Sequence, residues 1–257
     1  MAAVDTSTSD ETRARSRRGT TRAEGPPRDL TERMNLYAKS IAIGVLIALI
    51  GVGAFGRFYS ARFNGLVSTQ AMEVADIAQQ LRFNRGFSTR VVRPLALSYA
   101  TPDADGTVPE TRHQPLYPLL VSLLFRVRGG GDASMAMFNG LMLLLTGWVI
   151  YAIGRMAWDK PVGLLATAIY FVSIDAIGQA LTATSASLAG LLVTVAIWAA
   201  LRNRMSAKEE DETQDAGARG SLMWCAVLGG AFGLAWLSGS TAAMLIIPLA
   251  ILGSVPG

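Results

Sequence analysis

The sequence contains one cysteine, Cys225, and one histidine, His113, in 257 residues. A lone cysteine cannot form an intramolecular disulfide, and a lone histidine cannot build a metal site by itself. The sequence also lacks a glycine-rich loop ending in lysine, a dinucleotide-binding fingerprint and the paired Cys/His spacing of a zinc site. These absences argue against an ATP-driven or redox function.

Charged residues are scarce and apolar residues are abundant. The chain is 51% apolar and 16% charged, and its apolar residues come in blocks separated by short polar breaks. A helix needs roughly 20 apolar residues to cross about 30 Å of hydrocarbon. The sequence therefore predicts an all-α polytopic membrane protein with about six transmembrane helices, at residues 36–58, 133–156, 162–177, 181–201, 222–237 and 241–255. Several of these segments are short, so a broken or re-entrant helix remains an alternative.

The polar N-terminal segment, residues 1–35, is rich in Ser, Thr and Arg and has almost no large apolar side chains. We expect it to be a disordered cytoplasmic tail, followed by the transmembrane region 36–257. It is too long for the basic region of a cleaved signal peptide, so the first apolar segment is interpreted as a retained anchor. The later breaks alternate in charge as a multi-pass topology requires. Because the basic residues flank membrane segments, they do not indicate nucleic-acid binding.

The predicted first extracytoplasmic loop, residues 58–132, does not follow this alternation of charge. From Arg57 to Asp132 the chain has nine arginines and no lysine. Long loops escape the positive-inside rule, so the topology stands. Arginine pairs bidentately with phosphate, which suggests recognition of lipid phosphate or pyrophosphate. The alternative is that these arginines reach lipid headgroups from helices lying in the interface. Both interpretations place the loop at the bilayer surface.

Within this loop, the periodicity predicts an amphipathic helix over residues 69–83 that lies flat on the membrane. Its apolar side chains fall on one face and its polar side chains on an adjoining face, the latter being Glu73, Asp76 and Gln80. A carboxylate held above the bilayer can deprotonate an acceptor hydroxyl or hold a divalent cation. Glu73 and Asp76 are therefore candidate catalytic residues, with plain solvation as the alternative.

Two further positions are candidate substrate contacts. His113 stands beside a Pro-Leu-Tyr-Pro run at the predicted membrane surface, where it can bind phosphate or transfer a proton, or simply be polar. Asp175 falls at the outer end of the third predicted helix, on the same side as the arginine-rich loop, where an ionisable residue is a functional candidate or a solvated helix end.

Several short motifs follow one another in a recognisable order. They are an Ala-x-Ile-Ala-x-x-Leu helix (75–81), Arg-Gly-Phe-Ser-Thr (85–89), Arg-Pro-Leu-Ala-Leu (93–97) and Gln-Pro-Leu-Tyr-Pro-Leu-Leu (114–120). This order resembles the first extracytoplasmic loop of the GT-C superfamily of membrane glycosyltransferases, in particular bacterial family 39-like and RgtA/B/C/D-like enzymes. The resemblance covers the N-terminal half of such an enzyme.

The resemblance implies an inverting transferase of the bacterial inner (cytoplasmic) membrane with its N-terminus in the cytoplasm. Such an enzyme transfers a hexose or pentose from a polyprenyl-phosphate donor to an extracytoplasmic acceptor, with a loop carboxylate as general base. For such an activity we expect Arg90, Arg93, His113, Tyr117 and Asp175 to bind substrate, and a divalent cation is a possible cofactor. Glu73 or Asp76 is expected to act as the base, as a substitute for the family's carboxylate pair and not as a match to it.

The chain departs from the family pattern in two ways. Gln70-Ala71 stand where many of these enzymes have an Asp-Glu pair, and the sequence given has about six predicted crossings where the family has around a dozen. We therefore expect either part of a longer transferase or a shortened relative. The second hypothesis is a non-catalytic integral membrane subunit that retains a truncated GT-C fold and serves assembly or packing within a membrane protein complex.

Overall fold

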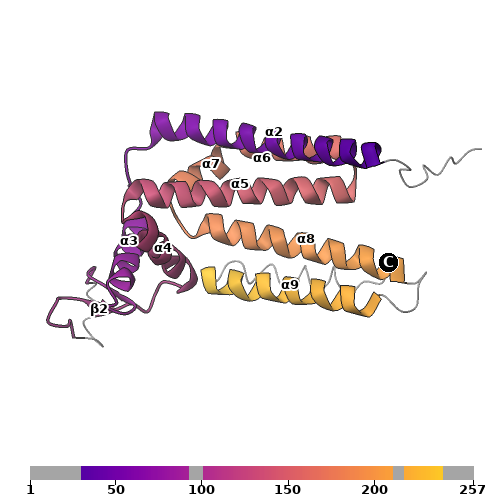
Figure 1. The fold of residues 1–257 in the computed structure, drawn as a ribbon. Coiled ribbons are helices and arrows are strands. Elements are labelled where there is room, and N and C mark those ends of the chain that lie inside the picture. The colour runs from indigo at the N-terminus through magenta and orange to yellow at the C-terminus, as the bar shows by residue number, and fades with distance from the viewer. Residues whose placement is uncertain (1–29, 93–100, 211–216, 240–257) are drawn as a thin grey trace, which may run out of the picture. The chain divides into compact units, whose positions relative to one another are not determined.

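The computed structural model describes residues 30–92, 101–210 and 217–239, and these form eight helices and one two-stranded sheet. The chain divides into two compact units, Met1–Ile43 and Gly44–Gly257. The described part of the first unit is helical and belongs to α2. All other elements lie in the second unit, and Figure 1 shows their order along the chain.

Helix α2 spans Leu30–Arg62 and is longer at both ends than the predicted 36–58. The predicted tail, 1–35, is therefore wrong for residues 30–35, which are helical, while residues 1–29 lie outside the described ranges. Leu30, Glu32, Arg33 and Met34 all have high helix propensity, so the helix extends beyond the apolar block. Hydropathy identifies the apolar part of a helix, not its ends.

Three helical segments are long and apolar enough to cross a membrane: Ala42–Arg62, Asp132–Ala157 and Ala186–Met205. A fourth is possible if α6 (Lys160–Val172) and α7 (Ile174–Leu181), which are bent by 55° at Ser173, together form one broken span. The expectation of six spans is therefore not met in the described residues. Helix α9 (Gly217–Ser238) has a shorter apolar stretch, Met223–Ser238, and residues 241–255 lie outside the described ranges.

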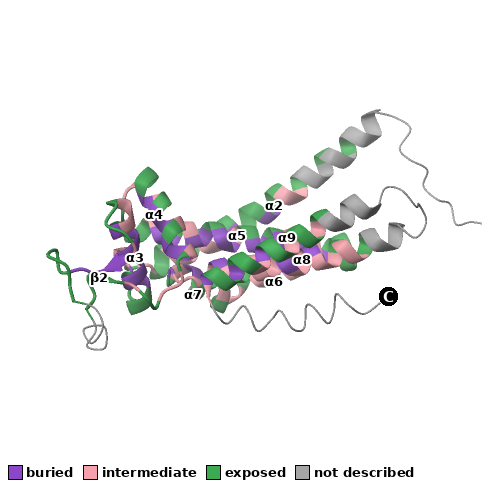
Figure 2. Cartoon of the chain, turned by 90° about the horizontal axis from the view of Figure 1, so that it is seen from below, coloured by how far each residue is buried: buried purple, intermediate pink, exposed green. Residues whose placement is uncertain are grey.

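The helical hairpin of α5 (Asp132–Ala157) and α6 is closely packed through glycines. A Cβ added at Gly154 would lie 2.6 Å from the Cα of Gly163, which leaves no room for a side chain at this crossing. Helix α5 also packs against α7 and α8 (Ala186–Glu210), and α8 pairs with α9. Figure 2 shows buried residues concentrated along α5 and where α3 meets α4.

The loop that follows α2 folds onto itself. Helix α3 (Thr69–Arg82) packs its apolar face against α4 (Leu116–Arg128), with Val74, Ala78, Val121 and Phe125 in the shared core. The predicted helix 69–83 is thus confirmed in extent. Its apolar face, however, contacts α4, so the expectation that this face lies on the membrane is wrong. The exposed apolar stripe belongs to α4 instead and consists of Leu119, Leu123 and Val127.

Between α3 and α4 the chain forms a short hairpin. Strand β1 (Ser88–Thr89) pairs antiparallel with β2 (Val108–Pro109), with Thr89 opposite Val108. Helix α4 then begins after Pro115 and carries Pro118 in its first turn, where a missing backbone N–H costs no helical hydrogen bond. The Pro-Leu-Tyr-Pro motif is therefore the start of a helix.

Candidate functional site

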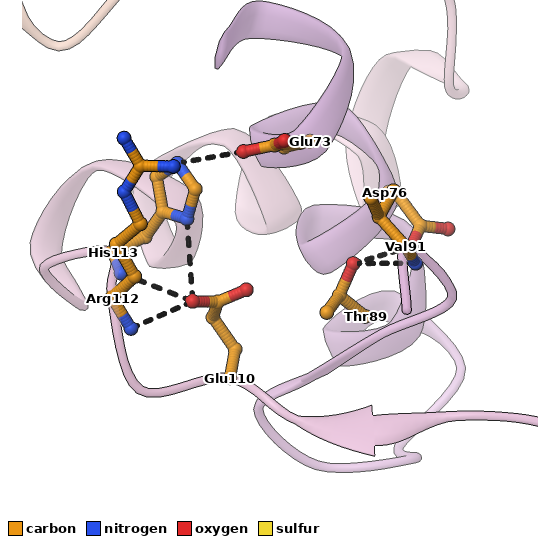
Figure 3. A network of polar contacts seen from close by, with 7 residues as sticks. All are labelled: Glu73, Asp76, Thr89, Val91, Glu110, Arg112 and His113. Carbon is orange, nitrogen blue, oxygen red and sulfur yellow. Dashed lines mark hydrogen bonds and ion pairs between the residues drawn. The ribbon is translucent and has the colours of Figure 1, made fainter. Parts of the chain in front are cut away.

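Polar side chains from α3 and from the β1–β2 hairpin meet in one cluster (Figure 3). Helix α3 supplies Glu73 and Asp76, which are three residues apart and so lie on neighbouring parts of one face. The hairpin and the segment after it supply Thr89, Glu110 and His113. The folding of the loop onto α3 is what brings these residues together.

His113 lies between two carboxylates. Its Nε2 is 3.4 Å from Oε2 of Glu73, and its Nδ1 is 3.4 Å from Oε1 of Glu110. Figure 3 shows the imidazole ring between the two glutamate side chains. A neutral imidazole has a single N–H, whereas the protonated ring can donate to both carboxylates. His113 therefore connects α3 to the segment after β2 through these two carboxylates.

Glu110 also shapes the backbone before α4. Its Oε1 accepts hydrogen bonds from the backbone N–H groups of Arg112, at 2.7 Å, and His113, at 3.3 Å. A carboxylate that accepts main-chain donors in this way holds a turn, as the shorter side chains of Asp and Asn often do in loops. Glu110 thus fixes the position from which His113 reaches Glu73.

Asp76 makes the second connection between α3 and the hairpin. Its Oδ2 accepts hydrogen bonds from Thr89 Oγ1, at 3.1 Å, and from the backbone N–H of Arg90, at 2.6 Å. Thr89 Oγ1 in turn accepts from the N–H of Val91 at 3.1 Å. Asp76 is half-buried and the Arg90 side chain is exposed. Asp76 therefore fixes the backbone at Thr89 and Arg90, and the Arg90 side chain extends from this point into solvent.

The prediction that Glu73 and Gln80 occupy a solvated polar face is wrong. Only 5% of Glu73 and 1% of Gln80 is exposed, because α4 and the folded hairpin cover this part of α3. Helical periodicity located these side chains on a face but could not show what covers that face. Of the two predicted carboxylates, Asp76 is the more accessible.

Tyr117, predicted to bind substrate, lies in the core with 1% of its surface exposed. Its hydroxyl donates to the carbonyl oxygen of Ala183, at 3.0 Å, and accepts from Nδ2 of Asn139, at 2.9 Å. Burial raises the pKa of Tyr117 well above its ordinary value. This side chain joins α4, α5 and the turn between α7 and α8, so its role is to connect the loop to the helices.

The remaining predicted residues are not part of the cluster. Asp175 is exposed in the first turn of α7, and in the described residues no hydrogen bond or ion pair connects it to α3 or the hairpin. Arg93 lies outside the described ranges. The contact between Tyr117 and Ala183 nevertheless places the α7–α8 turn against the loop helix α4, at one end of the second unit.

Two members of the cluster, Thr89 and Glu110, were not singled out from the sequence as site residues. Glu110 precedes His113 by three residues, a spacing that could have indicated their pairing across a turn. For Thr89 no such local signal exists, because its partner Asp76 is 13 residues away. In the ranges that the structure describes, no group of three or more His, Cys, Asp or Glu side chains is arranged to hold a metal ion.

The cluster contains groups that can transfer a proton, a partly accessible carboxylate and an imidazole held by two further carboxylates, and the neighbouring Arg90 has an exposed side chain of the type that binds anions. The amino-acid sequence matches no known family model, and neither a curated protein nor a solved structure is similar enough to be counted as a relative.

Proposed function

We propose that this protein is a membrane glycosyltransferase that transfers a sugar from a polyprenyl-phosphate donor to an extracytoplasmic acceptor. The observation that supports this most directly is the 2.6 Å hydrogen bond from the backbone N–H of Arg90 to Oδ2 of Asp76, which holds the half-buried carboxylate against the backbone of a residue with an exposed cationic side chain. Such an arrangement suits a reaction in which a hydroxyl loses a proton while a phosphate leaves.

In the proposed reaction, Asp76 takes the proton from the acceptor hydroxyl as its oxygen attacks the anomeric carbon. The bond from that carbon to the phosphate oxygen breaks, and the electron pair leaves with the polyprenyl phosphate. Arg90 and Arg93 neutralise the departing phosphate, and attack from the opposite face inverts the anomeric centre. Asp76 is preferred to Glu73 as the base because Oδ1 of Asp76 has no partner among the described residues, while Glu73 is buried against His113.

The proposal includes a membrane topology. Six crossings, an N-terminus in the cytoplasm and an outward-facing first loop are proposed for a bacterial inner membrane. The three helices of sufficient length, or four with the broken α6–α7 pair, are compatible with it. The contact of α4 with the α7–α8 turn is also compatible, because both segments are proposed to lie on the outer side.

The test is sugar transfer by the full chain in vesicles, with radiolabelled polyprenyl-phosphate hexoses and pentoses as donors and isolated envelope membranes as acceptor. Asp76→Asn should abolish transfer, whereas Asp105→Asn, at an exposed aspartate of the same loop, should not. Arg90→Ala should raise the donor concentration required, whereas Arg85→Ala, at a neighbouring exposed arginine, should not. Full transfer by Asp76→Asn would refute the assignment of the base.

A non-catalytic membrane subunit is the second candidate, and one observation favours it. Both loop carboxylates are already used within the protein, Glu73 by His113 and Asp76 by the hairpin backbone, as expected for residues that stabilise a fold. Under this hypothesis, a chain carrying Glu73→Gln and Asp76→Asn together should retain its cellular phenotype. Loss of the phenotype with the fold intact would exclude it.

A further inference from the structure

A groove of about 270 Å³ opens between α5, α6, α7 and α8, apart from the polar cluster of the loop. Its volume is close to the lower end of the roughly 300–1,000 Å³ typical of small-ligand sites. Much of the lining is polar. Six side chains carry a hydroxyl or an amide: Thr146, Tyr170, Ser173, Gln179, Ser187 and Thr194.

The break at Ser173 contributes to this groove. Helix α6 ends at Val172, and α7 continues at 55° to it, so Ser173, Ala176 and Gln179 line the groove beside α8. At 1.5 Å per residue, Ser173 lies about 20 Å along the helix from Lys160, which is well within a hydrocarbon layer of about 30 Å. At such a depth, an interrupted helix is tolerated where it is buried in protein or lines a polar cavity.

Three of the lining side chains, Ser173, Gln179 and Ser187, have no hydrogen-bond partner among the described residues. Thr146 and Thr194 donate to the carbonyl oxygens four residues earlier in their own helices, at 2.8 and 2.7 Å. The Thr146 side chain also pairs with Tyr170, whereas the hydroxyl oxygen of Thr194 can still accept. Gln179 is exposed and Ser173 and Ser187 are half-buried, so these groups are accessible from the groove and can pair with a polar occupant.

The lining also defines the chemistry of that occupant. No charged residue lines the groove, and apolar side chains such as Leu143 and Ile150 form the remaining wall. We propose that the groove binds the uncharged, hydroxyl-rich headgroup of a membrane lipid, either a glycosyl or a glycerol group. This inference rests on the proposed membrane placement of the helices and is independent of the transfer reaction at the loop.

Cysteine accessibility in the full chain tests the proposal. In a Cys225→Ser background, Ser173→Cys and Ser187→Cys each place one thiol in the groove, and Leu141→Cys places one on the exposed face of α5. The proteins are reconstituted in phosphatidylcholine nanodiscs and treated with a charged thiosulfonate. We expect both groove thiols to react and the thiol at position 141 to be protected by lipid.

Ligand protection then identifies the headgroup. Octyl glucoside and octylglycerol, each below its micellar concentration, are compared with octanol, which has the chain but lacks the polyol. A bound headgroup at ten times its dissociation constant should slow modification about tenfold, because only the unoccupied fraction reacts. The more effective of the two polar probes distinguishes a glycosyl from a glycerol group. Octanol should have no such effect.

A glycine of α8 offers a variant that fills the groove. Gly190 lines the groove, and a Cβ added there meets no heavy atom within 4 Å, so Gly190→Leu should fill the space without a backbone clash. Gly233→Leu in α9 is the matched control, since its Cβ also meets nothing within 4 Å and it lies outside the groove. Protection by the polar probes should be lost in the first variant and kept in the second.

The results separate two kinds of failure. If the thiol at position 141 reacts as fast as the groove thiols, the membrane placement is wrong. If position 141 is protected and the groove thiols are also unreactive, the helices are embedded but the groove is closed, which refutes the proposed site. Equal protection by octanol refutes the headgroup specificity. Circular dichroism of each variant verifies that the helices are retained.

Discussion

Replacing Gly163 with alanine should force α5 and α6 apart. A Cβ at this position would lie 2.8 Å from the carbonyl oxygen of Tyr151 and 2.9 Å from the backbone nitrogen of Arg155. Both atoms belong to the backbone of α5, so no side-chain rotation can relieve the contact. Reaching an ordinary contact of 3.4 Å requires the two helices to separate by about 0.6 Å.

The size of the effect follows from this separation. A gap of 0.5–1 Å forfeits a quarter to a half of the dispersion energy across a contact, and overpacking typically costs about 1–3 kcal/mol. Alanine recovers about 1 kcal/mol through its higher helix propensity. We therefore expect Gly163→Ala to lower the free energy of unfolding by up to about 2 kcal/mol.

Gly233→Ala is the matched control, because a Cβ there meets no heavy atom within 4 Å. Only the helix propensity changes, so this variant should gain up to about 1 kcal/mol. Unfolding of both variants by sodium dodecyl sulfate in mixed micelles, followed by circular dichroism, measures the two changes. The reasoning predicts opposite signs, and a Gly163→Ala protein as stable as the Gly233→Ala protein would refute it.

Three further predictions concern the loop. Tyr117→Phe leaves the Ala183 carbonyl and the Asn139 amide without their hydroxyl partner and should cost about 1–3 kcal/mol in the same unfolding assay. Burial raises the pKa of Tyr117 above its ordinary 10.0, so above about pH 10 only the unfolded state releases this proton and the native protein should lose stability. Tyr117→Phe should lack this contribution. An identical loss of stability at alkaline pH in the wild type and in Tyr117→Phe would contradict the prediction. His113→Gln breaks the connection from Glu73 to Glu110, so hydrogen exchange of the backbone amides at residues 110–113 should accelerate, whereas Gln114→Ala should leave it unchanged. Finally, if the exposed stripe of α4 contacts lipid, a fluorophore attached to Leu123→Cys in the Cys225→Ser background should be quenched by spin-labelled lipid. A fluorophore attached at the buried position, Ser122→Cys, should not be quenched. Equal quenching at both positions would argue against an interfacial α4.

The helices with strong local patterns were predicted closely from sequence. The expected helix 69–83 corresponds to α3, Thr69–Arg82, and the expected span 133–156 corresponds to α5, Asp132–Ala157. In both, the signal lies within the segment itself, as a 3.6-residue period in α3 and as a continuous apolar run in α5. The break at Ser173 was located less well, because Val172, Ser173 and Ile174 lower helix propensity only slightly and the apolar run continues through them.

The sequence likewise predicted only part of the site. The sequence identified Glu73, Asp76, Arg90 and His113 as candidates because ionisable residues are rare in this chain and these lie in its most polar loop. It could not predict that Glu73 is buried, that Glu110 holds His113, or that Tyr117 belongs to the core. Each of these depends on a partner from another element, such as the hairpin around β1 and β2 or the α7–α8 turn.

The sequence by itself thus determined that the protein is helical, where its main apolar helices lie, and which loop carries its ionisable groups, since these properties depend on the composition and period of single segments. Only the tertiary structure decided which face of each helix is covered and which polar groups meet. A helical face looks the same in sequence whether another helix, lipid or water covers it, because its side-chain pattern records polarity and not the identity of its neighbour. The accessibility of Asp76, the burial of Glu73 and the polar groove beside Ser173 are therefore properties of packing.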